Sequence, residues 1–130
     1  MKKIVTLIIA SALILTGCSS SSTPAVEHLD SARFADKIIE ADVVTLDVRT
    51  AGEFMAGHIN GAINIDVEGN TFDAEIANLD KTKTYAVYCQ SGRRSQIAVD
   101  MMASTGFVSL FNLENGISDW NTKGLPVVTS

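Results

Sequence analysis

The residues with the clearest chemical potential form one seven-residue segment, Cys89-Gln90-Ser91-Gly92-Arg93-Arg94-Ser95. An apolar run over residues 85–88 precedes it and is typical of a buried strand, while residues 96–105 repeat their apolar positions at helical spacing. In a glycine-containing loop between a strand and a helix, backbone N–H groups converge, and the positive end of the helix dipole lies beside them. This arrangement stabilises an anion, and the thiolate of Cys89 is one.

The cysteine of this segment has two positive neighbours and no thiol partner. Arg93 and Arg94 add two full positive charges to a chain of 130 residues whose formal net charge is −5. The other cysteine, Cys18, is assigned below to a lipid, which leaves Cys89 without an intramolecular disulfide partner. We therefore predict that Cys89 is reactive; the alternative is a buried and inert thiol.

The first 25 residues are typical of an export signal followed by a tether. Lys2 and Lys3 precede an apolar run over residues 4–15, which is shorter than the roughly 17–25 residues of a transmembrane helix. The sequence Leu-Thr-Gly-Cys at residues 15–18 resembles a bacterial lipobox, whose cysteine receives a diacylglycerol and becomes the mature N-terminus. Residues 19–24 read Ser-Ser-Ser-Ser-Thr-Pro, which is a flexible spacer.

This pattern divides the chain into a lipoprotein signal peptide (1–17), a lipidated Cys18 with a Ser-rich tether (18–25) and one folded domain (26–130). The alternative is an ordinary signal peptide that ends near a cysteine. A lipid on Cys18 would hold the domain on a bacterial membrane, facing the periplasm. The serine after Cys18 favours the outer membrane if the host has two membranes, by resemblance to known sorting rules. Without residues 1–17 the chain has eight basic and 15 acidic side chains, a net charge of −7, which argues against nucleic acid as a partner.

The remaining sequence alternates strands with helices. Strands are predicted at residues 26–29, 43–46, 63–65, 85–88 and 107–113, and helices at residues 31–40, 51–56, 71–78, 96–105 and from residue 115. This order predicts an α/β fold with a mostly parallel sheet covered by helices on both faces. Ligands bind beyond the carboxyl ends of the strands in such sheets. Because residues 47–49 and 89–94 follow two of these ends, we expect them to share one rim.

Three motifs follow one another along the chain. The first is Leu-Asp-Val-Arg-Thr at residues 46–50 with Glu-Phe at 53–54 and Gly-His-Ile-Asn-Gly-Ala at 57–62, the second is the loop at residues 88–95, and the third is Leu-Glu-Asn-Gly-Ile-Ser-Asp-Trp at 113–120 with Gly-Leu-Pro-Val at 124–127. In this order they resemble the motifs of the rhodanese-like single-domain sulfurtransferases. The resemblance covers about residues 26–128, far more than a lone Cys-x-x-Gly-x-Arg pattern. It implies a five-stranded parallel sheet flanked by helices.

The resemblance also implies a function. Cys89 would be the nucleophile and would carry sulfane sulfur as a persulfide, taken from a small anionic donor such as thiosulfate and passed to cyanide or a thiol, with no cofactor. The rest of the loop would bind the donor and stabilise the thiolate: Gln90, Ser91, Gly92, Arg93, Arg94 and Ser95. Arg94 matches the arginine of the family's loop and Arg93 is an additional charge, and the sequence leaves open which of the two faces the substrate. Asp47 and Arg49 are expected to support the base of the site.

Several local roles follow from the neighbours of each residue. Ser95 is predicted to cap the following helix, and the alternative is that it lends its hydroxyl to the loop. Arg49 is predicted to form an ion pair with Glu53, four residues later. His58, inside the glycine-rich motif, is expected to bond to the backbone rather than to act as a base, and His28 is expected to lie on the surface. Two distant histidines without a second thiol do not have the spacing of a metal site.

Three other functions fit parts of the sequence. A phosphatase or arsenate reductase on the same fold uses Cys-x5-Arg, whereas the residue six positions after Cys89 is Ser95. A thiol–disulfide oxidoreductase needs a resolving cysteine, which a partner protein would have to supply. A non-catalytic binding module would need the fold alone, yet this chain retains the cysteine and its loop. Sulfur transfer is therefore the favoured interpretation, and we expect the protein to be a monomer.

The lipid anchor has a direct test. Because acyl chains on Cys18 would hold the protein on the membrane, Cys18→Ala is expected to move it from the membrane fraction to the soluble fraction of lysed cells, as followed by immunoblotting. Ser21→Ala changes the tether but keeps the cysteine, and this control should stay with the membranes. A Cys18→Ala protein that remains membrane-bound would mean that the anchor lies elsewhere.

Overall fold

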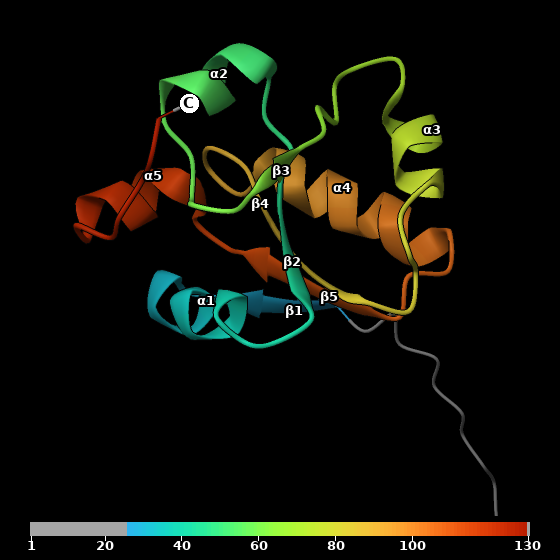
Figure 1. The fold of residues 1–130 in the computed structure, drawn as a ribbon, viewed down its shortest axis with the longest axis horizontal. Helices are drawn as coiled ribbons and strands as arrows, with labels where there is room; N and C mark the ends of the chain where they lie inside the picture. Colours follow the sequence, from blue (N-terminus) through green and yellow to red (C-terminus); the bar gives the residue numbers. More distant parts are fainter. Residues whose placement is uncertain (1–25, 130) are drawn as a thin grey trace, which may run out of the picture.

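A parallel sheet forms the centre of the domain. The computed structural model describes residues 26–129, and five strands of this part of the chain pair in parallel in the order β1-β5-β4-β2-β3 (Figure 1). The strands are β1 (Val26–Leu29), β2 (Val43–Asp47), β3 (Ile63–Asn64), β4 (Thr84–Tyr88) and β5 (Ser109–Leu113). The predicted α/β fold with a five-stranded sheet is therefore confirmed.

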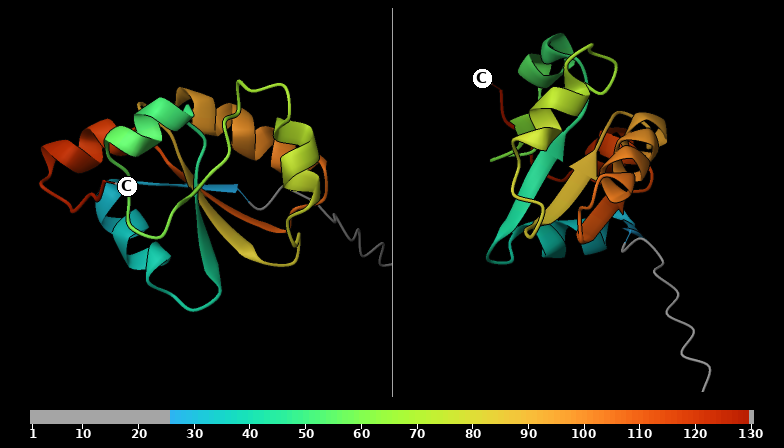
Figure 2. Two further views of the ribbon diagram at one scale, coloured as in Figure 1. Left: turned by 45° about the horizontal axis from the view of Figure 1, so that its top comes forward. Right: turned by 90° about the vertical axis from the view of Figure 1, so that its right-hand side faces the viewer.

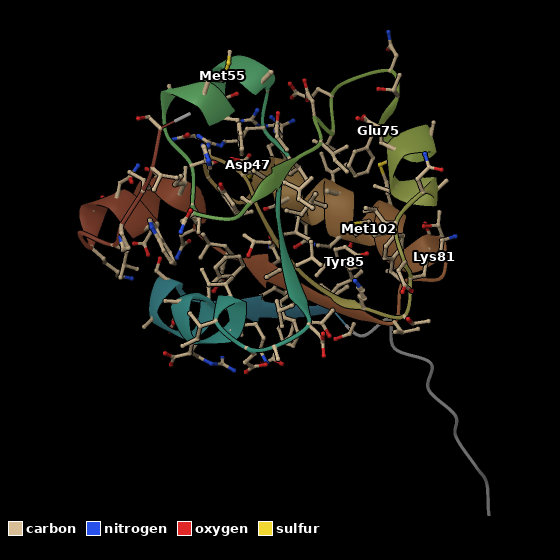
Figure 3. All side chains as sticks on the ribbon, viewed as in Figure 1. Asp47, Met55, Glu75, Lys81, Tyr85 and Met102 are labelled. Carbon is tan, nitrogen blue, oxygen red and sulfur yellow. The ribbon has the colours of Figure 1, made fainter. Side chains whose placement is uncertain are left out.

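Helices cover both faces of the sheet, as predicted. They are α1 (Ser31–Ile38), α2 (Ala51–Ala56), α3 (Phe72–Ala77), α4 (Arg93–Ser104) and α5 (Gly116–Thr122). α1 and α5 pack on one face, around a cluster that contains Phe34 and Trp120. α3 and α4 pack on the other face, around a cluster that contains Tyr85 and Met102. Figure 3 shows Tyr85 and Met102 between the sheet and α4.

β4 lies in the middle of the sheet and is buried from both sides. Tyr85, Val87 and the following Cys89 belong to the cluster under α3 and α4. Ala86 and Tyr88 belong to the cluster under α1 and α5. A strand with apolar neighbours on both faces has a continuous apolar run in its sequence rather than an alternation. This burial fixes Cys89 at the carboxyl end of the central strand.

α2 stands beyond the carboxyl end of β2 (Figure 2). Thr50 starts this helix, because its Oγ1 accepts a hydrogen bond from the Glu53 N–H at 3.3 Å. The Met55 side chain projects outward in Figure 3 and is 58% exposed. Glu53 instead reaches the residues after β4, where it contacts Arg94. α2 therefore forms one wall of the rim that the sequence predicted.

The segment after β5 holds the loop after β4 from another side. The Ile117 N–H, at the start of α5, donates to the carbonyl oxygen of Cys89 at 2.9 Å. The next N–H, that of Ser118, donates to the carbonyl oxygen of Gln90 at 3.0 Å. Because α5 satisfies these two carbonyl groups, the N–H groups of the loop are free to turn inward.

Two glycines permit this close approach. Gly92 has a φ of +99°, and a Cβ there would overlap the carbonyl oxygen of Glu114. Gly116 has a φ of +67°, and a Cβ there would overlap the carbonyl oxygen of Gln90. Glycine is required at both positions because the backbone is left-handed and no space exists for a side chain.

One helix boundary differs from the prediction in a way that matters for the site. α4 begins at Arg93, three residues before the predicted start at residue 96. Arg93, Arg94 and Ser95 therefore form the first turn of the helix rather than part of the loop. Apolar periodicity did not detect this turn because all three residues are polar.

The predicted signal peptide (1–17) and the Cys18 tether (18–25) lie outside the described residues. Within residues 26–129, no helix has the length and apolar character needed to cross a membrane.

The contact between α5 and the loop can be tested with two glycine substitutions. Gly116→Ala is expected to lower the free energy of unfolding by at least about 3 kcal/mol, because a left-handed backbone and an overlap with the loop act together. Gly61 also has a positive φ, +81°, but nothing lies within 4 Å of a Cβ there. Gly61→Ala should therefore lose only about 1–2 kcal/mol. Urea unfolding measures both losses, and equal values would contradict the overlap at Gly116.

Candidate active site

The Cys89 thiol lies at the N-terminus of α4. It follows β4 directly and has no solvent exposure. The Gly92 N–H donates to its sulfur at an N-to-S distance of 3.1 Å. Gly92 is the N-cap residue of α4 and provides no side-chain cap. The first N–H groups of the helix, which have no intrahelical partner, therefore remain available to the sulfur.

Hydrogen bonds make the thiolate of Cys89 more stable than burial alone would allow. Burial raises the pKa of the thiol, but the Ser95 hydroxyl and several backbone N–H groups outweigh this effect, and the pKa falls below its ordinary value. The N–H groups belong to Ser91, Gly92 and Ser95. A thiolate is the nucleophilic form of cysteine, so the lowered pKa increases the fraction of the reactive form.

Ser95 lies beside the sulfur, and its predicted role as a helix cap is wrong. It is the third residue of α4 and fully buried, whereas Gly92 occupies the N-cap position. Its Oγ donates to the Gly92 carbonyl oxygen at 3.1 Å and also lies within reach of the Cys89 sulfur. The single hydroxyl proton can therefore turn toward the sulfur when the thiol ionises.

Arg94 and Glu53 form an ion pair across the rim. Arg94 Nη1 and Nη2 donate to the two carboxylate oxygens of Glu53 at 2.8 and 2.9 Å. These bonds lower the pKa of Glu53 to about 2. The predicted ion pair between Arg49 and Glu53 is therefore wrong. The charge of Cys89 acts on Arg94, whereas Arg93 is exposed and forms no ion pair with any residue of the described part of the chain.

Asp47 and Arg49, which were expected to support the base of the site, form a buried ion pair. Arg49 Nε and Nη2 donate to the Asp47 carboxylate at 3.0 and 2.7 Å, and the two residues are 3% and 0% exposed. Figure 3 shows Asp47 at the end of β2, next to the rim. Arg49 also donates to the Gly57 carbonyl oxygen at 2.7 Å and to Gln90 Oε1 at 3.4 Å. The segments at 47–49 and 89–94 thus meet at one rim, as the sequence predicted.

The two histidines have structural positions, as expected. His58 Nδ1 lies 2.8 Å from the Phe54 carbonyl oxygen, and the two rings stack with their centroids 3.7 Å apart. The His58 backbone pairs with Val128 in an antiparallel bridge. His28 is exposed on β1. Among residues 26–129, no group of three or more His, Cys, Asp or Glu side chains could hold a metal ion.

Two further polar residues, which the sequence motifs did not single out, hold the rim together. The Asn64 amide, on β3, donates to the backbone carbonyls of Asp47 and Arg49 at 3.0 and 2.8 Å. The Tyr88 hydroxyl accepts a hydrogen bond from the Ile59 N–H at 3.0 Å. A polar group inside an otherwise apolar strand was the available signal, because buried polar atoms need partners.

A family model described as a rhodanese-like domain matches residues 30–123. The chain belongs to this family. A sulfurtransferase of Allochromatium vinosum is 29% identical over 104 residues, which cover 79% of this chain and 95% of that protein. The putative sulfur carrier protein YrkF of Bacillus subtilis is 27% identical over 81% of this chain and 56% of its own length. A tRNA uridine(34) hydroxylase of Cytophaga hutchinsonii is 34% identical over 94 residues, but this rhodanese-like chain spans only 30% of it.

Solved structures of the family have the same fold. A rhodanese-related protein of Thermoplasma volcanium has a TM-score of 0.71 and 31% identity, covering 80% of this chain and 99% of that one. A rhodanese-like domain protein of Staphylococcus aureus has a TM-score of 0.68 and 25% identity. Together with the sulfurtransferase relative, the family supports an enzyme of the sulfurtransferase type.

The role of Ser95 can be measured through the reactivity of the thiol. Ser95→Ala removes a hydrogen bond that favours the thiolate, so the pKa of Cys89 should rise. Alkylation by iodoacetamide at pH 7 should then slow by about tenfold, and its pH profile should move to higher pH.

A second serine of α4 provides the matched control. Ser104 Oγ donates to the Met101 carbonyl oxygen three residues earlier, as Ser95 Oγ does to Gly92, but at the other end of the helix. Ser104→Ala should leave the alkylation profile unchanged. Identical profiles for Ser95→Ala and the unmodified protein would rule out a role of Ser95 in stabilising the thiolate.

Proposed function

We propose that Cys89 carries sulfane sulfur as a persulfide, from a donor such as thiosulfate to an acceptor such as cyanide or a thiol. The main support is the position of the sulfur at the start of α4, where the Gly92 N–H lies 3.1 Å from it. The lowered pKa of Cys89 supplies the nucleophilic thiolate. The same N–H groups can stabilise the terminal sulfur of a persulfide, which is also an anion.

The proposed reaction consists of two substitutions at sulfur. In the first, the Cys89 thiolate attacks the outer sulfur of thiosulfate, the sulfur–sulfur bond of the donor breaks, and sulfite leaves with the bonding electron pair. In the second, cyanide attacks the outer sulfur of the persulfide, thiocyanate leaves, and the Cys89 thiolate is regenerated. Neither step needs an external oxidant, an external reductant or a cofactor.

The short loop favours sulfur over phosphate as the group transferred. Only Gln90, Ser91 and Gly92 separate Cys89 from the first residue of α4. Phosphatases on this fold use the longer Cys-x5-Arg loop, whose arginine surrounds a tetrahedral oxyanion. Here Arg94 points to Glu53 instead. This geometry therefore disfavours the phosphatase and arsenate reductase alternatives.

We further propose that the protein acts on a membrane surface facing the periplasm. The support is the sequence alone: a lipobox that ends at Cys18, followed by a Ser-rich tether. The domain would then meet its sulfur donor and acceptor outside the cytoplasm, held by the lipid.

The proposed function is tested by mass spectrometry of the soluble domain. Incubation with thiosulfate is expected to add about 32 daltons, one sulfur atom, to a peptide that contains Cys89, and cyanide should remove this mass and release thiocyanate. Cys89→Ser replaces the nucleophile and should abolish both steps. If neither thiosulfate nor any other sulfane donor modifies Cys89, the sulfurtransferase proposal is wrong.

A further inference from the structure

The positive charges around the Cys89 thiol are mostly neutralised. Three arginines lie at or near the loop. Arg49 is bound by Asp47 through a contact of 2.7 Å, and Arg94 is bound by Glu53 through a contact of 2.8 Å. Arg93 is exposed to solvent, where its charge is screened. The two arginines that could bind an anionic donor are therefore already bound to carboxylates.

Hydrogen bonds from two residues fix the position of the Glu53 carboxylate. Its Oε1 accepts a hydrogen bond from the Thr50 hydroxyl at 3.1 Å, while the Thr50 Oγ1 caps the helix that carries Glu53. Both of its oxygens bind Arg94, whose side chain is only 18% exposed. The charge of Glu68 adds to that of Glu53 at Arg94. This guanidinium is therefore engaged before any donor arrives.

We propose that Glu53 sets the donor specificity of the site: by binding Arg94 through both oxygens, it disfavours dianionic donors such as thiosulfate and favours low-molecular-weight persulfides. This inference rests on the proposed sulfur transfer and names the donor class. Thiosulfate brings two negative charges close to the Glu53 carboxylate. A persulfide carries at most one negative charge on its outer sulfur, and none in the protonated form R–S–SH that the Cys89 thiolate attacks.

The leaving groups of the two donors lead to the same conclusion. Transfer from thiosulfate releases sulfite, a dianion that needs a free cation beside it. Transfer from a persulfide, R–S–SH, breaks its sulfur–sulfur bond and forms one to Cys89; the thiolate RS⁻ leaves with the electron pair, and the proton stays with the sulfur that is transferred. This leaving group carries a single charge at the reacting atom, so a neutralised Arg94 suffices.

A cavity beside the ion pair can hold the organic part of a persulfide. Its volume is about 230 Å³, and its lining residues are Arg49, Glu53, Ala56, Gly57, Asn121 and Val127. Arg49 connects this cavity to the loop through its contact with Gln90, the residue after Cys89. An inorganic donor has no group to place there.

The experiment compares two donors on three proteins. The rate constant kcat/KM for loading Cys89 is measured with thiosulfate and with cysteine persulfide, for the unmodified domain, Glu53→Gln and Glu27→Gln. Glu27 also forms an ion pair, with Arg33, on the exposed surface of β1 and α1, so Glu27→Gln is a control with the same change of charge. Glu53→Gln is expected to raise kcat/KM for thiosulfate about tenfold and to change that for the persulfide less than about threefold.

The ratio of the two kcat/KM values decides the question. Because the fraction of folded protein cancels in this ratio, a partly destabilised Glu53→Gln variant still gives an answer. Glu53→Asp keeps the charge and should keep the ratio near that of the unmodified domain, as should Glu27→Gln. A ratio that stays unchanged in Glu53→Gln overturns the role of Glu53 but leaves sulfur transfer intact. If neither donor loads Cys89 on the unmodified domain, the proposed function itself fails.

Discussion

The structure depends on one constraint: a buried sulfur atom must be able to carry a negative charge. Cys89 has no solvent exposure, and burial alone opposes its ionisation. The compensation comes from hydrogen bonds of the loop and the first turn of α4, which are close enough to act on a single atom. These bonds exist only if the chain turns from strand to helix within three residues. Most of the other motifs of the chain serve to hold that turn.

The supports of the turn come from segments that are distant in sequence. α5 satisfies the carbonyl groups of Cys89 and Gln90, and this contact requires the absence of a side chain at Gly116. From the other side, Arg49 connects the end of β2 to Gln90. A loop whose carbonyl groups are fixed outward has its N–H groups fixed inward. The closing segment at residues 113–120 is therefore part of the site, and it acts there through backbone hydrogen bonds to the loop.

The sequence was sufficient for features that depend on burial and motif order, and insufficient for features that depend on side-chain direction. The continuous apolar run of β4 located the central strand, and the flanking motifs located the rim at residues 47–49 and 89–94. Ser95 was assigned to a cap because sequence spacing cannot show that a left-handed glycine starts the helix three residues earlier. Arg49 was paired with Glu53 by helical spacing, yet Asp47, two residues away and equally buried, binds it instead.

The actual partner of Glu53, Arg94 instead of the predicted Arg49, changes the electrostatics of the whole site. A local rule pairs residues within one helix, whereas the structure uses Glu53 to neutralise an arginine 41 positions away. Negative charge on the Cys89 sulfur is thus stabilised mainly by the dipoles of N–H and O–H groups. These dipoles act strongly on an atom in contact, but their effect falls off rapidly with distance. The chain as a whole has a net charge of −5, so its long-range field repels anions. A site of this kind acts mainly on an atom at contact distance, and the net charge of the chain gives no long-range attraction to an anionic ligand.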